Sequence, residues 1–306
     1  MQQKTIKNIL EIQGIGLHSG KTVTMRIIPA SADHGIVFKR VDITDLEESI
    51  VPARFDIVRD TKLCTMLIND LGTKVGTIEH LMSALAYLKI NNALIEIDSF
   101  EVPILDGSST IFIEKISQIG IQDLSAPRKV LKILKPVELK TEKWSVKIVP
   151  SNSFILNVEI EFANQVIGKQ SHRFDINDGD YFRDISKART FCLEQEIAYL
   201  QSAGLALGGS LDNAIVVGKE DVLNPEGLRY ENEFARHKLL DALGDLYLCG
   251  YEIKGEFFGD KCGHESNNLL LREIFKDKSN YEVETDYSNY SIPLVISPKD
   301  SIVEKF

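Results

Sequence analysis

The chain presents its secondary-structure signals twice in the same order, strands first and helices later, and this order limits the folds open to it. Residues 1–60 contain alternating runs such as KTVTMRIIPA and GIVFKRVDI, and helical periodicity first appears at about residues 77–88. Strand-like runs resume near residue 129, and a helical pattern returns at about residues 231–249. Strands followed by helices indicate an α+β fold with antiparallel sheets.

The segment SAPRK, residues 125–129, separates the two halves. It follows a helical pattern and contains a proline just before strands resume, as a linker would. We therefore expect two domains, residues 1–126 and residues 127–306. Within the second, the runs LEQEIAYLQSAG, LGGSLDN and AIVV suggest an insert at about residues 193–217.

Composition excludes several classes of protein. The formal net charge is −10, whereas a nucleic-acid-binding protein would carry a basic face, so we expect no nucleic-acid partner. The four cysteines are scattered and form no CxxC pair, which fits reduced thiols in the cytosol. There is no signal-peptide pattern and no apolar run near the ~20 residues that span a bilayer. These features predict a cytoplasmic protein that is not embedded in a membrane.

The stretch GTIEHLMSALAYL, residues 76–88, places two ionisable residues side by side in a helix that otherwise fits a protein core. Apolar residues recur through it at helical spacing. Burying Glu79 and His80 together costs free energy unless charge, hydrogen bonds or a metal compensates. The helix therefore predicts a polar partner elsewhere in the chain.

The stretch NEFARHKLLDALGDLYLCG supplies a candidate partner. His237, Asp241 and Asp245 follow one another at intervals of four, so they lie along one face of a helix. Such a stripe is commonly a solvated face or a helix-stabilising pair. Here apolar residues leave little of the helix for solvent, which favours a specific contact for the stripe.

These stretches together supply the ligands of a catalytic zinc site. Two imidazoles and one carboxylate, leaving a position open for water, are typical of such sites, and His80, His237 and Asp241 would provide them. The zincin pattern HExxH is absent, because Glu79 precedes the histidine instead of following it. His18, in GIGLHSG, is expected to be a turn histidine.

An acid and a base complete the set. Glu79 lies beside the proposed metal and could take a proton from an attacking water molecule. His264, in KCGHESNN, by itself could be a cap or a surface histidine. With Asp245 beside it, its imidazole would stay charged and able to donate a proton.

At this point the whole chain resembles a known family, the UDP-3-O-acyl-N-acetylglucosamine deacetylases, which are zinc amidases of lipid A biosynthesis in Gram-negative bacteria. The resemblance rests on seven motifs in order: GIGLHSG, TIEHLMSAL, EVPILDGSS, ARTFC, GLALGGSLDNAIVV, NEFARHKLLDALGDLYL and GHESNN. It implies two layered α+β domains with their helices facing the interface, and a β-α-β insert in the second domain.

The resemblance also implies roles for single residues. It repeats the assignment of the metal ligands, of Glu79 as base and of His264 as acid, and it makes Asp245 the partner of that histidine. Thr190 of ARTFC would stabilise the oxyanion, and Lys238 would engage the anionic part of the substrate. The residues expected along the acyl passage and the active-site wall are Phe191, Ile197, Leu63 and Cys64.

The implied reaction is hydrolysis of the 2-acetamido group of UDP-3-O-[(R)-3-hydroxyacyl]-N-acetylglucosamine, which releases acetate and a free amine. The expected cofactor is Zn²⁺, with Fe²⁺ as the alternative, and the only expected partner of the monomer is its acylated UDP-sugar substrate. Two other classes stay open: a zinc amidohydrolase for a different acetylated sugar, and a nucleotide-sugar binding protein without catalysis. The second would have no need of Glu79.

Overall fold

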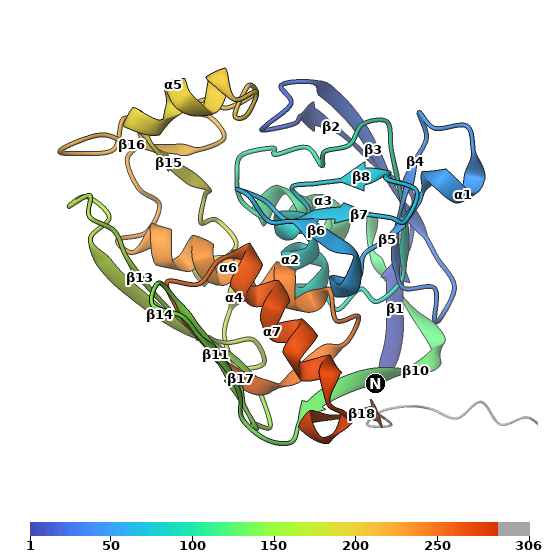
Figure 1. Cartoon of the computed structure of the whole chain (residues 1–306). Coiled ribbons are helices and arrows are strands. Elements are labelled where there is room, and N and C mark those ends of the chain that lie inside the picture. Colours follow the sequence, from blue (N-terminus) through green and yellow to red (C-terminus); the bar gives the residue numbers. More distant parts are fainter. Residues whose placement is uncertain (287–306) are drawn as a thin grey trace, which may run out of the picture.

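The computed structural model describes residues 1–286, which adopt an α+β fold with four sheets and seven α-helices in that part of the chain (Figure 1). Residues 287–306, the end of the expected second domain, lie outside the described residues. Between residues 1 and 286 no helix combines the length and the apolar character needed to cross a membrane.

A five-stranded sheet forms in the first part of the chain, in the order β2–β3–β9–β4–β5. Its strands alternate in burial, as in β3, where Val23, Met25 and Ile27 face the core and are fully buried. The strands of this sheet are β2 (Leu10–Ile15), β3 (Thr22–Pro29), β4 (Ile36–Arg40), β5 (Ile50–Pro52) and β9 (Ala93–Ile97). The same part of the chain contains α1 (Leu46–Ser49), α2 (Glu79–Tyr87), α3 (Thr110–Ile119) and a small sheet of β6 (Val58–Asp60), β7 (Met66–Ile68) and β8 (Lys74–Val75).

An eight-stranded sheet combines β1 with most strands of the second half of the chain, with the path β1–β10–β17–β12–β11 and three further strands paired to it. Its members are β1 (Gln2–Ile6), β10 (Ile121–Ile133), β11 (Val137–Lys140), β12 (Ser145–Val149), β13 (Phe154–Glu161), β14 (Lys169–Asp175), β17 (Glu252–Asp260) and β18 (Tyr281–Asp286). Helices α4 (Tyr181–Asp184), α6 (Glu233–Tyr247) and α7 (His264–Lys276) belong to this part.

The sheets are mixed, which corrects the expectation of purely antiparallel sheets. Strand β9 runs parallel to β4, and β17 runs parallel to both β10 and β13. Parallel neighbours require a crossover connection of a dozen or more residues. The chain provides one between β4 and β9, where the small sheet and α2 intervene.

The segment expected as a linker, residues 125–129, is part of strand β10. The first half of β10 pairs with β1, and its second half pairs with β17 and β18. Residue Pro127 is tolerated within the strand at the irregular part of the β1 pairing, where the register shifts.

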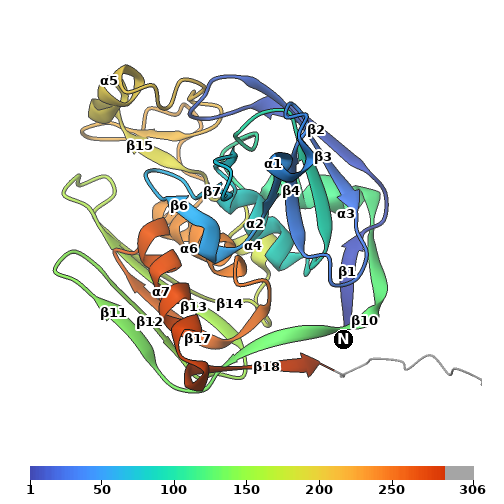
Figure 2. The ribbon, with the colours of Figure 1, turned by 45° about the vertical axis from the view of Figure 1, so that its right-hand side comes forward.

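A separate β-α-β unit forms at the edge of the molecule. It comprises β15 (Phe191–Leu193), α5 (Glu194–Ser202) and β16 (Ile215–Val217), with the two strands parallel. Both views show it beside the loop that joins β2 to β3 (Figures 1 and 2).

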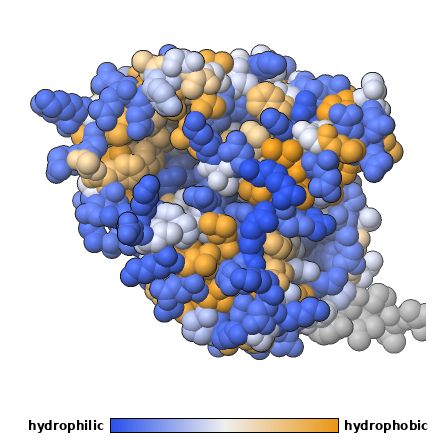
Figure 3. Space-filling model, viewed as in Figure 1, coloured by the Kyte–Doolittle hydropathy of each residue, from blue (hydrophilic) through white to orange (hydrophobic). Residues whose placement is uncertain are grey.

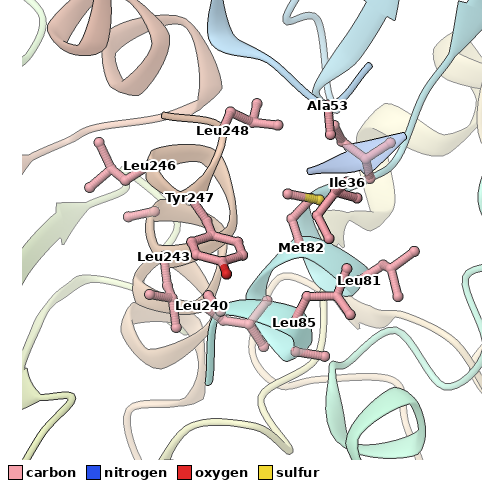
Figure 4. Close-up of a cluster of buried hydrophobic side chains, with 14 of the residues drawn as sticks. Ile36, Ala53, Leu81, Met82, Leu85, Leu240, Leu243, Leu246, Tyr247 and Leu248 are labelled. Atoms are coloured by element: carbon pink, nitrogen blue, oxygen red, sulfur yellow. The ribbon is translucent and has the colours of Figure 1, made fainter. Parts of the chain in front are cut away.

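Helices α2 and α6 pack against each other at the centre of the molecule, between the two large sheets (Figure 2). Apolar residues of both helices meet there, including Leu81 and Leu85 of α2 and Leu240 and Leu243 of α6 (Figure 4). Gly244 allows the close approach, because a Cβ there would lie 2.0 Å from the carbonyl oxygen of Glu79. The helix pair therefore brings the first turn of α2 directly against α6.

Candidate active site

Three helices supply the polar residues that the sequence singles out. Glu79 and His80 are the first two residues of α2, and α6 contributes His237, Asp241 and Asp245. His264 is the first residue of α7. All six side chains are buried.

The backbone before α2 is strained. Thr77 is a β-branched residue in the left-handed region, with φ of 55°, which is rare for such residues. Its hydroxyl donates to Oε1 of the buried Glu101 at 3.0 Å, and this bond helps to hold the turn. The turn sets the direction in which Glu79 and His80 leave the chain.

His80, His237 and Asp241 form a cluster of potential metal ligands. One ligand atom from each lies within 4.8 Å of the others. Oδ1 of Asp241 is 3.3 Å from Nε2 of His237 and 3.6 Å from Nε2 of His80. That Oδ1 is buried and has no hydrogen-bond partner among the described residues, a costly condition for a carboxylate oxygen. A bound cation would remove this cost.

The surroundings of the cluster keep its ligand atoms available. Nδ1 of His237 faces the carbonyl oxygen of Ala188 at 3.0 Å, which leaves Nε2 of that ring free to coordinate. Burial lowers the pKa of His237 to about 3, against the opposing charge of Asp241, so the ring is neutral. Lys238 donates to Oδ2 of Asp241 at 2.9 Å and leaves Oδ1 free. Two imidazoles and a carboxylate oxygen are a donor set that fits zinc.

Glu79 and His264 face each other beside this cluster. Oε1 of Glu79 is 3.9 Å from Nε2 of His264, and Oε2 accepts a hydrogen bond from the backbone N–H of Thr65 at 3.1 Å. Burial raises the pKa of Glu79, although the charge of His264 acts in the opposite direction. A carboxylate with a raised pKa is better matched to accept a proton near neutral pH.

Asp245 holds the other side of the His264 ring. Its Oδ2 lies 2.9 Å from Nδ1 of His264. Burial alone would lower the pKa of this histidine, but the charges of Asp245 and Glu79 outweigh it and raise the pKa to about 9. The imidazole is therefore protonated at neutral pH.

Two residues of this network were not anticipated from the sequence. Thr65 donates its hydroxyl to Oδ1 of Asp245 at 2.6 Å, and Asn267 donates to Oδ2 of Asp245 at 2.9 Å. Thr65 directly follows the candidate wall residues Leu63 and Cys64, and Asn267 lies in the motif GHESNN. This nearness to other candidate residues was the available sequence signal for both.

A cavity of about 350 Å³ opens next to Thr190 and is formed largely by the β-α-β unit. Phe191, Ile197 and Leu63 line it, together with Thr190 and the turn residue His18. Figure 3 shows apolar surface around this unit at the upper left. Its size and apolar lining suit a hydrocarbon chain.

Cys64 is not among the residues that line this cavity. It is only 4% exposed, whereas its neighbour Leu63 is 47% exposed. Burial, with a smaller contribution from the charge of Glu79, raises the pKa of the Cys64 thiol. The two neighbouring side chains therefore have different environments, one at the cavity and one in the interior.

Lys238 lies between the ligand cluster and the cavity. Its ammonium, besides the bond to Asp241, lies 5.7 Å from the centre of the Phe191 ring. Arg189, the residue before Thr190, is buried and ion-paired with Glu233 at 2.9 Å. Lys238 is thus the cation that the structure places at this junction.

Known proteins similar to this chain indicate its family. The model of the family described as UDP-3-O-acyl N-acetylglycosamine deacetylase matches residues 3–276. The chain belongs to this deacetylase family. Among curated relatives, the UDP-3-O-acyl-N-acetylglucosamine deacetylase of Vibrio vulnificus (strain YJ016) is 44% identical over 99% of both chains. Proteins of the same name from Vibrio cholerae (O395) and Shewanella violacea are 43% and 44% identical, over 99% and 96% of both chains.

Proposed function

We propose that this protein hydrolyses the 2-acetamido group of UDP-3-O-[(R)-3-hydroxyacyl]-N-acetylglucosamine, the committed step of lipid A biosynthesis. The observation that carries the proposal is the convergence of a metal-ligand cluster, a base and an acid beside an apolar cavity. Membership of the deacetylase family and the names of close relatives support the choice of substrate.

The metal would be held by His80, His237 and Asp241. The unpartnered Oδ1 of Asp241 and the neutral ring of His237 fit Zn²⁺, and Fe²⁺ is the alternative for the same donors. When bound, such an ion lowers the pKa of water toward ~7 and polarises the amide carbonyl.

Glu79 and His264 would move the protons. Glu79, whose pKa is raised by burial, would take a proton from the attacking water. His264, protonated through its pairing with Asp245, would donate a proton to the departing nitrogen. That proton is needed because an amine anion is a very poor leaving group.

The remaining side chains would bind and orient the substrate. The Thr190 hydroxyl would donate a hydrogen bond to the developing oxyanion, an interaction whose loss typically costs ~2.7–4 kcal/mol of barrier. Lys238 would attract the anionic part of the substrate. Phe191, Ile197 and Leu63 would contact the acyl chain in the cavity.

The proposal also includes the domain organisation and the location of the protein. We take residues 1–126 and 127–306 as two layered domains whose helices meet at the interface, with the β-α-β unit as an insert of the second domain. We place the monomeric enzyme in the cytoplasm.

The test is acetate release from the 3-O-acylated UDP-sugar and from plain UDP-N-acetylglucosamine, with and without prior chelation. We expect rapid release from the acylated substrate only, abolished by chelation and restored by Zn²⁺. Equal release from both sugars would indicate a broader deacetylase. No release from either, with metal present, would favour a binding protein.

A further inference from the structure

Two walls of the cavity beside Thr190 come from distant parts of the chain, and Leu63 lines it as well. One wall belongs to the β-α-β unit, and the other is the loop between β2 and β3, which supplies Leu17 and His18. The same two segments lie side by side in both ribbon views (Figures 1 and 2). The β-α-β unit alone therefore does not enclose the cavity.

Backbone hydrogen bonds join the two walls along a seam, which we define as the contact between residues 15–20 and residues 206–208. The N–H of Gly208 donates to the carbonyl oxygen of Leu17 at 3.0 Å, and the N–H of Leu207 donates to the carbonyl oxygen of His18 at 3.2 Å. The N–H of Ala206 also points to Nδ1 of His18, at 3.4 Å.

Gly208 leaves no space at the seam. A Cβ at this position would lie 2.3 Å from the carbonyl oxygen of Gly16 and 2.7 Å from Cγ2 of Ile15. The first of these atoms is backbone, so the clash can be relieved only by moving the two walls apart.

Glu101 fixes the loop side of the seam. Its buried carboxylate accepts hydrogen bonds from the N–H groups of His18 and Ser19, at 2.7 and 2.8 Å, and from the hydroxyl of Thr77. Thr77 directly precedes the turn into α2, so one carboxylate ties the cavity wall to the entry of the helix that carries Glu79.

We propose that this seam sets the closed width of the acyl-binding cavity, with Gly208 as a specificity-determining residue and Glu101 as a positioning residue. The inference rests on the proposed function, because it takes the occupant to be the acyl chain of the substrate. When the seam is closed, each methylene added to the acyl chain is shielded from water on all sides. A parted seam lets water reach the chain from one side.

The experiment measures how affinity depends on chain length, using 3-hydroxy fatty acids of increasing length and the zinc-loaded protein in calorimetry. In the wild type, affinity should rise about fourfold per added methylene until the cavity is full. In Gly208→Ala the rise should fall to about twofold per methylene, since roughly half of the contact area is exposed to water. Acylated substrates of the same lengths should show the change in KM more than in kcat.

Ser202→Thr is the matched control. It adds one methyl group to the same β-α-β unit at an exposed position outside the cavity lining, and it should keep the wild-type dependence. A merely structural effect of Gly208→Ala would lower affinity for every chain length by the same factor. That result, or an unchanged dependence, would overturn the inference.

Glu101→Gln tests the seam from the loop side. The amide replaces one accepting oxygen with a donor, which faces N–H groups, so the loop should shift and the dependence should flatten as well. This isosteric variant tests the inference even if Gly208→Ala yields too little folded protein. If Glu101→Gln kept the full wild-type dependence of affinity on chain length, the inference would be overturned. A wild type with no dependence on chain length would instead remove the acyl cavity of the proposed function, and the seam's role with it.

Discussion

At the scale of single residues, the pairing of Asp245 with His264 decides which protonation state the site offers. The imidazole is buried, which favours its neutral form, yet Asp245 at 2.9 Å and Glu79 at 3.9 Å keep it charged. The pKa of Glu79 is also raised, but there burial, which favours the neutral form, outweighs the charge of His264. The same buried space therefore holds a base with a raised pKa and an acid that retains its proton.

Replacing Asp245 by Asn should move the alkaline limb of the pH–activity profile to lower pH. The acid works only when protonated, and with a pKa of about 9 its protonated fraction falls as the pH rises through 9. Removing the opposite charge lets burial lower this pKa by ~1–3 units, so activity should be lost from a correspondingly lower pH. The measurement is kcat/KM as a function of pH.

The matched control for this change is Glu265→Gln, which removes an exposed carboxylate next to His264 in the sequence. We expect its alkaline limb to coincide with that of the wild type. A profile for Asp245→Asn with an unmoved alkaline limb would show that another group supplies the proton.

At the scale of elements, the contact between α2 and α6 aligns the two halves of the ligand cluster. Glu79 and His80 lie at the start of α2, and its backbone meets Gly244, which lies about one turn beyond Asp241 on α6. The absence of a side chain at Gly244 thus sets the distance between His80 and the α6 ligands.

Gly244→Ala should therefore lower both stability and metal affinity. Helix propensity alone would favour alanine by about 1 kcal/mol. The added Cβ, 2.0 Å from a backbone oxygen, forces the helices apart, and we expect a net loss of about 2–3 kcal/mol in the free energy of unfolding. Urea unfolding and the zinc content of the purified protein would measure the two effects.

Gly250→Ala provides the comparison for Gly244→Ala. Gly250 has a positive φ of 79° but no atom within 4 Å of its Cβ position, so this variant carries backbone strain without a clash. We expect it to lose only ~1 kcal/mol and to retain its zinc. Equal losses in the two variants would mean that packing against α2 is not what Gly244 provides.

Sequence periodicity located the helices at about residues 77–88 and 231–249 and many strands, because these depend on local patterns of burial. It did not give the order of strands, since placing β9 beside and parallel to β4 depends on a pairing across more than fifty residues. The candidate ligands could be found because His237 and Asp241 are one turn apart and His80 lies in a core-like helix. The bond from Thr65 to Asp245 joins residues 180 positions apart, and no local pattern encodes it.

At the scale of the whole molecule, the ligand cluster connects the two large sheets through their helices. His80 belongs to the part of the chain that forms the five-stranded sheet. His237 and Asp241 lie on α6, which packs against β13 and β14 of the eight-stranded sheet. A metal bound only by the folded protein would stabilise this connection, by ~2.7 kcal/mol at a free concentration of 100 times its Kd.

Chelation should therefore lower the melting temperature of the protein. For a chain of 306 residues that unfolds as one unit, a loss of ~2.7 kcal/mol corresponds to a decrease of about 4 °C, which added Zn²⁺ should reverse. Asp241→Ala should melt at the same temperature with and without chelator, because it lacks a ligand that both imidazoles face. Lys238→Met keeps all three ligands and should respond to chelation like the wild type, although its activity falls. If chelation left the wild-type melting temperature unchanged while abolishing activity, the metal would serve the chemistry without joining the helices. The cluster would then be organised by the α2–α6 packing at Gly244 alone.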